Sequence, residues 1–153
     1  MDKRTEINDS LKVALKNKDK VAVSTIRLVM AALKDRDISA REHGNAQGIS
    51  DDEILLMLQT MVKQRLESAK TYSEAGRDDL AEREEAEIDV IRSFMPKQLN
   101  EEEIKQVVDT LIVEIGADGI KDMGRIMAVL KEKYAGQVDM GKAGGIAKAK
   151  LSA

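Results

Sequence analysis

The sequence predicts an all-α fold, with a four-helix N-terminal domain over residues 1–95 and a three-helix C-terminal domain over residues 96–153. Apolar residues recur at spacings of three and four along nearly the whole chain, which is the period of a helix. No segment shows the strict alternation that is typical of a half-buried strand. Aromatic residues make up only 2% of the chain, so the core depends on aliphatic residues and eight methionines, which suit helix-on-helix packing.

The first two helices follow from apolar stripes. Ile7, Leu11 and Leu15 share one helix face. Asp19 is placed to cap a second helix, because its carboxylate can accept a hydrogen bond from a free backbone N–H. Residues 21–33 are apolar on most faces, which predicts that other helices surround this one at the centre of the first domain.

A glycine-rich loop and a long third helix come next. Residues 44–48 contain two glycines and predict a loop. Ser50 and Glu53 have the spacing of a capping box, in which each side chain bonds the other's free backbone N–H. The apolar spacing then continues for more than five turns, and Gly76 is placed to end the helix.

The fourth helix is predicted between a pair of aspartates and the only proline. Asp78 or Asp79 can provide its N-cap. Pro96 disfavours helical geometry at Met95, so the helix is predicted to end there and the domain with it.

Three shorter helices follow the proline. Asn100 and Glu103 form a second capping-box pattern, and Gly116 is placed to stop that fifth helix. The sixth helix is predicted over residues 122–134 and the seventh over residues 139–151. Three glycines are expected to weaken the seventh helix by about 1 kcal/mol each relative to alanine, namely Gly141, Gly144 and Gly145.

Composition limits the location and the partners. The chain has no cysteine, which excludes disulfides and thiolate metal sites. It begins with polar residues in place of an apolar signal sequence and contains no run of about 18 apolar residues, so we expect a cytoplasmic protein without a membrane segment. The net charge of −3 combines an acidic middle, −7 over residues 74–103, with basic ends of +3 over residues 1–43 and 117–153. Only the ends are expected to meet phosphate.

No catalytic group, cofactor site or metal site is predicted. The only histidine, His43, lies beside the predicted loop without an oriented partner, which favours a surface role. No serine lies in a nucleophile motif, and no glycine-rich phosphate loop is present. The acidic run from Glu82 to Asp89 spreads over several helix faces and favours a solvated surface.

Two groups of cations are the candidate binding residues. Arg27 interrupts the apolar second helix, and Lys63 and Arg65 lie on the third. Together they predict either an ion pair with a glutamate or a cleft between these helices for an anionic ligand. The second group lies in the basic C-terminal segment and comprises Lys121, Arg125, Lys131, Lys133, Lys142 and Lys148. This group predicts either a solvated surface or a surface that binds an anion. For the second alternative, the lack of aromatic residues for base stacking favours backbone contact with a folded RNA over single-strand recognition.

Three segments carry a resemblance to a known family. They are residues 61–80, beginning Met-Val-Lys-Gln-Arg, residues 86–99, ending Phe-Met-Pro-Lys-Gln-Leu, and residues 122–127 with Gly136 and Asp139. On these segments the chain resembles the GatB/YqeY family, and over its full length it is similar to the YqeY-like members.

The resemblance implies a helical N-terminal domain and a three-helix C-terminal domain similar to the tail of the B subunit of glutamine-dependent aspartyl/glutamyl-tRNA amidotransferase. That tail contacts tRNA, and the family carries the label of carbon–nitrogen ligase with glutamine as amide donor. The catalytic regions of the amidotransferase have no counterpart here. The glycine-rich segment 140–145 departs from the family pattern.

Three functions follow as alternatives. The first is a non-catalytic module that binds tRNA or another folded RNA, or that associates with the amidotransferase or aminoacyl-tRNA machinery. The second is a protein-interaction module without an RNA role, in which the acidic face at residues 82–89 meets a basic partner. The third is an enzyme that uses the cleft near Arg27, Lys63 and Arg65.

Overall fold

The computed structural model describes residues 2–153, and all regular structure in that range is helical. This confirms the predicted all-α class. The elements are α1 (Lys3–Lys16), α2 (Lys20–Glu42), α3 (Asp51–Glu74), α4 (Asp78–Arg92), α5 (Glu101–Ile115), the short 3₁₀ helix η1 (Ile120–Asp122), α6 (Met123–Lys133) and α7 (Met140–Leu151). None of these helices is long and apolar enough to cross a membrane.

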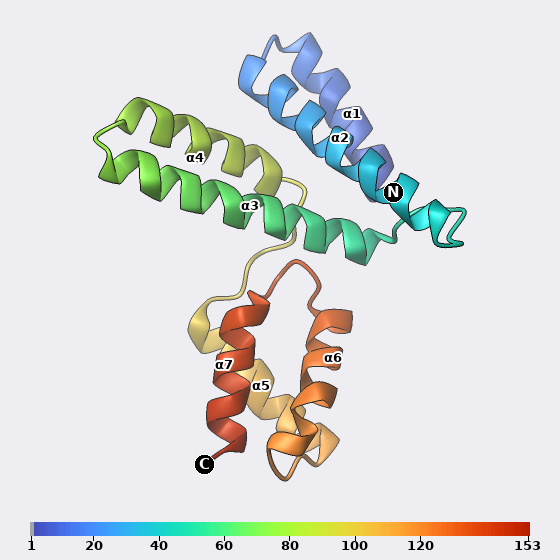
Figure 1. Ribbon diagram of the computed structural model, residues 1–153, viewed down its shortest axis with the longest axis vertical. Helices are drawn as coiled ribbons and strands as arrows, with labels where there is room; N and C mark the ends of the chain where they lie inside the picture. Colours follow the sequence, from blue (N-terminus) through green and yellow to red (C-terminus); the bar gives the residue numbers. More distant parts are fainter. Residues whose placement is uncertain (1) are drawn as a thin grey trace. The chain divides into compact units, whose positions relative to one another are not determined.

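The chain divides into two compact units, Met1–Met95 and Pro96–Ala153. The first contains α1 to α4, and the second contains α5, η1, α6 and α7 (Figure 1). Each has its own hydrophobic core. The units are therefore described one at a time.

Two helical hairpins form the N-terminal unit, α1 with α2 and α3 with α4 (Figure 1). Its core is centred on α3, where Ile54, Met57 and Leu58 are fully buried. Ile91 of α4 and Val29 of α2 are also fully buried. Aliphatic and methionine side chains therefore fill this core, as the composition predicts.

The prediction that α2 is surrounded by other helices is correct only in part, because α2 packs against α1, α3 and α4 but keeps one face exposed. Val21, Leu28 and Ile38 are exposed, and Leu28 keeps 49% of its surface. Only the side that carries Ile26, Val29 and Leu33 is buried. A helix can carry apolar residues on a free face because a few exposed apolar side chains cost little.

Local capping rules account for most helix ends. The side chains of Asp19, Asn100 and Ser50 cap their helices as predicted, and Ser50 and Asn100 each form a complete capping box. Gly76 follows the end of α3 with φ of 73°, and Gly116 ends α5 with φ of 71°. Both glycines adopt the left-handed conformation that ends a helix.

The predicted boundaries of α4 are wrong at both ends. Neither aspartate caps it: the N-cap is Arg77, which makes no capping bond, and Asp79 instead accepts two 3.2 Å hydrogen bonds from the Arg77 guanidinium. The helix ends at Arg92, three residues before Met95. The chain turns there and buries the Phe94 side chain. The backbone carbonyl oxygen of Phe94 accepts a 2.7 Å hydrogen bond from Lys3 Nζ.

The C-terminal unit packs three helices around a small core. Ile104 and Val108 of α5, Ile126 and Leu130 of α6, and Ala143 and Ala147 of α7 are at most 1% exposed. Alanines therefore face the core from α7. The Cβ position of Gly144 lies 3.7 Å from Met127 Cε, and that of Gly145 faces open space.

Candidate functional site

The C-terminal cations lie on the surface of η1, α6 and α7. Lys121 lies in η1, directly before α6, whereas Arg125 lies on α6 itself. Helix α6 spans 11 residues, which corresponds to about 16 Å at 1.5 Å per residue. It runs antiparallel to α7 after the short connection at residues 134–139 (Figure 1).

This arrangement separates the cations into two groups at opposite ends of the α6–α7 pair. The loop-side group comprises Lys131, Lys133 and Lys142, next to the connecting loop. The far-side group comprises Lys121, Arg125 and Lys148. Arg125 and Lys131 are six residues apart on α6, so they also lie on faces about 120° apart. The six cations thus cover several faces of the unit and do not form one stripe.

The five lysines of these groups are exposed, and within residues 2–153 their ammonium groups have no ion-pair partner. Arg125 is 62% exposed and makes only long contacts, 3.4 Å to Asp122 Oδ1 and 3.5 Å to the Ile115 carbonyl oxygen. Lys150, in contrast, pairs with Asp109 of α5 at 2.6 Å. The candidate lysines therefore need break no ion pair before they bind an anion.

Asp122 is the carboxylate that competes most directly for Arg125. The hydrogen bond from the Asp118 backbone N–H, 2.9 Å long, lowers the pKa of Asp122, and the charges of Lys121 and Arg125 add to this effect. Asp122 therefore stays ionised at neutral pH.

The whole C-terminal unit carries nine cations and nine anions, so the basic character is local and belongs to α6 and α7.

The segment before α5 fixes the loop next to the loop-side group. The Leu99 backbone N–H donates to the Gln137 carbonyl oxygen at 2.8 Å. The Gln98 amide Nε2 donates to the carbonyl oxygens of Gly136 and Pro96. Gly136 has φ of 74°, a conformation that favours glycine. The Asp139 carboxylate then caps α7 by accepting from the Lys142 N–H.

The N-terminal candidates do not gather in one place. Arg65 faces α4, where its guanidinium Nε lies 3.3 Å from Glu87 Oε2, and both side chains are at most 15% exposed. Its Nη1 also donates to the Met61 carbonyl oxygen. Arg27 and Lys63 are exposed. For Arg65, the geometry is that of the predicted ion pair with a glutamate.

The remaining residues considered for chemistry lie on the surface. His43 is the C-cap of α2, and its Nδ1 lies 2.8 Å from the Ser39 carbonyl oxygen. Glu82 and Glu85 are exposed on α4. Among residues 2–153, no group of three or more histidines and carboxylates could hold a metal ion.

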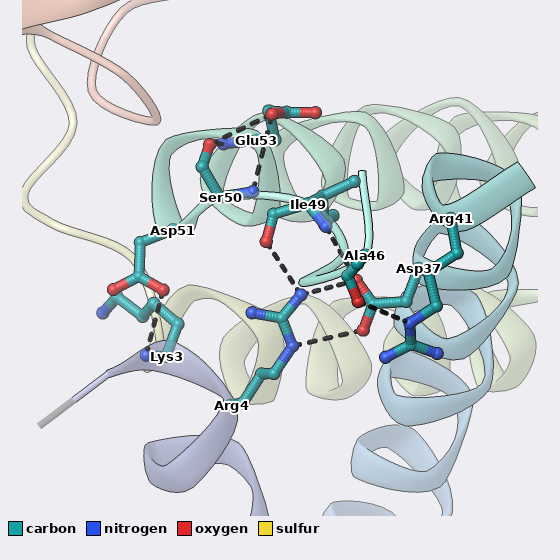
Figure 2. Close-up of polar contacts among 9 residues, drawn as sticks. All are labelled: Lys3, Arg4, Asp37, Arg41, Ala46, Ile49, Ser50, Asp51 and Glu53. Carbon is teal, nitrogen blue, oxygen red and sulfur yellow. Dashed lines mark hydrogen bonds and ion pairs between the residues drawn. The ribbon is translucent and has the colours of Figure 1, made fainter. Parts of the chain in front are cut away.

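Sequence reasoning missed a partly buried polar contact, which joins Arg4 to Asp37 (Figure 2). Arg4 Nη2 also donates to the Ile49 carbonyl oxygen at 2.8 Å, and the Ile49 N–H donates to Asp37 Oδ1 at 2.9 Å. Asp37 continues the buried stripe of Val29 and Leu33 at a spacing of four. A carboxylate at a core position of a helix is the signal that predicts such a buried partner.

Comparison with known proteins shows what the chain is similar to. The family model of "Yqey-like protein" matches residues 4–151. The chain is 33% identical to "Altered inheritance of mitochondria protein 41, mitochondrial" of Clavispora lusitaniae, over 82% of this chain and 75% of that protein. The protein of the same name from Lachancea thermotolerans is 30% identical over 75% of this chain, and that from Saccharomyces cerevisiae 28% over 72%. In both, the match spans 60% of the relative's own length.

The names of these relatives contradict the predicted cytoplasmic location, because all three are described as mitochondrial. The prediction depended on the lack of an apolar signal sequence. That criterion tests only the secretory route, since mitochondrial transit peptides are amphipathic and arginine-rich. The similarity to the YqeY-like model covers both units of the chain. The chain therefore belongs to the YqeY-like protein family.

Proposed function

We propose that the C-terminal unit binds the phosphate backbone of a folded RNA, with tRNA as the first candidate, and that it does so without catalysing a reaction. The observation that carries this proposal is the set of five exposed lysines without ion-pair partners in the described chain, together with the exposed Arg125. Each cation that neutralises a phosphate releases a counterion, which favours binding at low salt.

The two separated groups suit a folded RNA better than a single strand. On α6, Arg125 lies six residues from Lys131 and eight from Lys133, which is about 9–12 Å along the helix axis, so the two groups can reach different phosphates of a helical RNA. The only aromatic side chain in this unit, Tyr134, is half-buried, and base stacking therefore contributes little. Recognition by shape and backbone is the mode that remains.

A supporting role in tRNA-dependent amide transfer is part of this proposal. It depends on the resemblance between the C-terminal unit and the amidotransferase tail, and the relatives' names do not address it. Under this proposal the ligase chemistry belongs to a separate partner, and this chain presents or retains the tRNA.

Fluorescence anisotropy with labelled tRNA over a salt series tests the proposal. We expect affinity to fall steeply as salt rises, and the double variant R125A/K131A to reduce the slope of log K against log salt by about one unit per lost contact. The matched control is R83A/K70A, which removes one exposed arginine and one exposed lysine outside both basic ends and is expected to leave the slope unchanged. Absence of binding at low salt, or equal effects of the two double variants, contradicts the proposal.

A further inference from the structure

An open groove lies in the N-terminal unit, and Asp89 of the acidic run is the one candidate residue described above that lines it. Helix α1, the start of α2 and the end of α4 line it, and its volume is about 560 Å³. The lining residues of α1 and its C-cap extend from Glu6 to Asn17 on one face. Eleven residue steps at 1.5 Å correspond to about 16 Å, the length of three helical turns.

The floor of the groove is apolar and closed. Ala14, Ile26 and Phe94 line it and are at most 6% exposed, so their packing belongs to the core. Val13 also lines the groove and keeps 58% of its surface exposed. An apolar partner side chain would remove this surface from water at little cost, since the floor is already desolvated.

The rim of the groove is acidic. Four carboxylates line it, and no lysine or arginine does. They belong to Glu6, Asp9, Asp19 and Asp89.

Nearby cations neutralise this rim only in part. Lys3 Nζ pairs with Glu6 at 3.0 Å, whereas Lys12 approaches Asp9 only to 3.8 Å and is 81% exposed. Such an exposed ion pair between Lys12 and Asp9 is weak and neutralises little of the Asp9 charge. Within residues 2–153, the carboxylate of Asp89 has no ion-pair or hydrogen-bond partner. The groove therefore keeps a negative rim around an apolar floor.

We propose that this groove docks a basic amphipathic helix of a partner protein. Apolar residues at positions i, i+3 and i+7 of that helix would lie over Val13 and the floor, and its lysines or arginines would meet the rim. The carboxylates exclude nucleic acid and anionic lipid as occupants, because both would be repelled. The proposal concerns a different unit from the RNA-binding surface and does not depend on it.

The probe is a labelled 14-residue peptide of leucine and lysine, with leucines on one helix face. Its control has the same composition in an order that spreads the leucines around the helix. Anisotropy with the full chain should show binding of the first peptide and weaker binding of the second. In ¹⁵N spectra, the amides of Val13 and Phe94 should shift on addition of the first peptide only.

Two double variants distinguish binding in the groove from non-specific attraction to the acidic surface. D9N/D89N removes two rim charges and should weaken binding about threefold to tenfold, in line with the modest strength of exposed charge pairs. E82Q/E85Q removes two exposed charges of α4 outside the groove and should change binding less than twofold. Equal effects of the two variants, equal binding of the two peptides, or shifts confined to other residues would overturn the proposal. So would a concentration-dependent dimer that V13R dissociates, because the occupant would then be a second copy of this chain.

Discussion

Arg4 and Asp37 lie 33 residues apart in the sequence and form a two-point ion pair that connects the first turn of α1 to α2 (Figure 2). Asp37 Oδ1 also accepts from the Ile49 N–H, and Arg4 donates to the Ile49 carbonyl oxygen. One residue of the loop before α3 is thus bonded through both of its backbone polar groups. These contacts among Arg4, Asp37 and Ile49 hold in place the end of the loop at residues 44–48, which the sequence predicts only as a break between helices.

Replacing Asp37 by Asn is expected to destabilise the N-terminal unit by about 2 kcal/mol at pH 7, because Arg4 then loses its counter-charge. Burial raises the pKa of Asp37, but the hydrogen bonds from Arg4 and from the Ile49 N–H outweigh it and lower the pKa below the ordinary value of 3.8. Its stabilising effect is therefore complete above the unfolded-state pKa and is lost as the pH falls below about 4. Urea unfolding of the wild type and D37N should show a gap that narrows from pH 7 to pH 3. A gap that stays constant would contradict this account.

Replacing Gly48 by Ala is expected to destabilise the same loop strongly. Its φ of 84° is unfavourable for a side chain, and an added Cβ would lie 2.3 Å from Asp37 Oδ1. Gly44→Ala is the matched control, since Gly44 has φ of 93° but no atom within 4 Å of the Cβ position. We expect about 1 kcal/mol for G44A from backbone strain alone, and a clearly larger loss for G48A. Thermal unfolding of both variants measures the difference, and equal losses would show that the loop can shift away from Asp37.

The Arg65–Glu87 pair is expected to matter more than a surface pair of similar chemistry. Its side chains are 15% and 13% exposed, whereas those of Arg77 and Asp79 are 58% and 67% exposed. R65M should cost about 2 kcal/mol, because Glu87 keeps only the 3.8 Å contact with Arg83. R77M should change stability by less than about 0.5 kcal/mol. Chemical denaturation compares the two, and an equally small effect of R65M would mean that solvent screens the pair.

Replacing Gly145 by Ala is expected to stabilise the C-terminal unit by about 0.5–1 kcal/mol, because alanine favours a helix and no atom lies near the Cβ position. Gly116→Ala is the opposite case, since Gly116 has φ of 71° at the end of α5 and alanine there should cost about 1 kcal/mol. Differential scanning calorimetry should therefore show a higher unfolding temperature for G145A than for the wild type, and a lower one for G116A. Destabilisation by G145A would indicate a constraint on α7 beyond helix propensity.

The sequence predicted helix class and most helix ends well because these depend on neighbouring residues. The capping boxes at Ser50 and Asn100 and the glycine at 116 act within one helical turn. The prediction failed for α4, where Arg77 draws Asp79 into an ion pair and away from the capping position. It also failed in part for α2, because periodicity gives the apolar residues of a helix but not how much of its surface the neighbouring helices cover.

The candidate site was predictable as a list of residues but not as an arrangement. Spacing could not show that Lys121 lies in a separate 3₁₀ turn, or that Lys142 and Lys131 share one end of a helix pair. The partner of Arg65 also required three dimensions, because Glu87 lies 22 residues away on another helix. Charge pairing between helices depends on their packing, which no local pattern specifies.

The bonds from Gln98 and Leu99 to the loop before α7 bear on where a fragment of the C-terminal unit should begin. A fragment that starts at Asn100 retains all three α-helices, yet the carbonyl oxygens of Gly136 and Gln137 lose the donors they have in the full chain. A fragment that starts at Pro96 retains both. A fragment of this unit should therefore keep residues 96–99, which belong to no helix. Removing them would loosen the loop that joins α6, which carries Lys131, to α7, which carries Lys142.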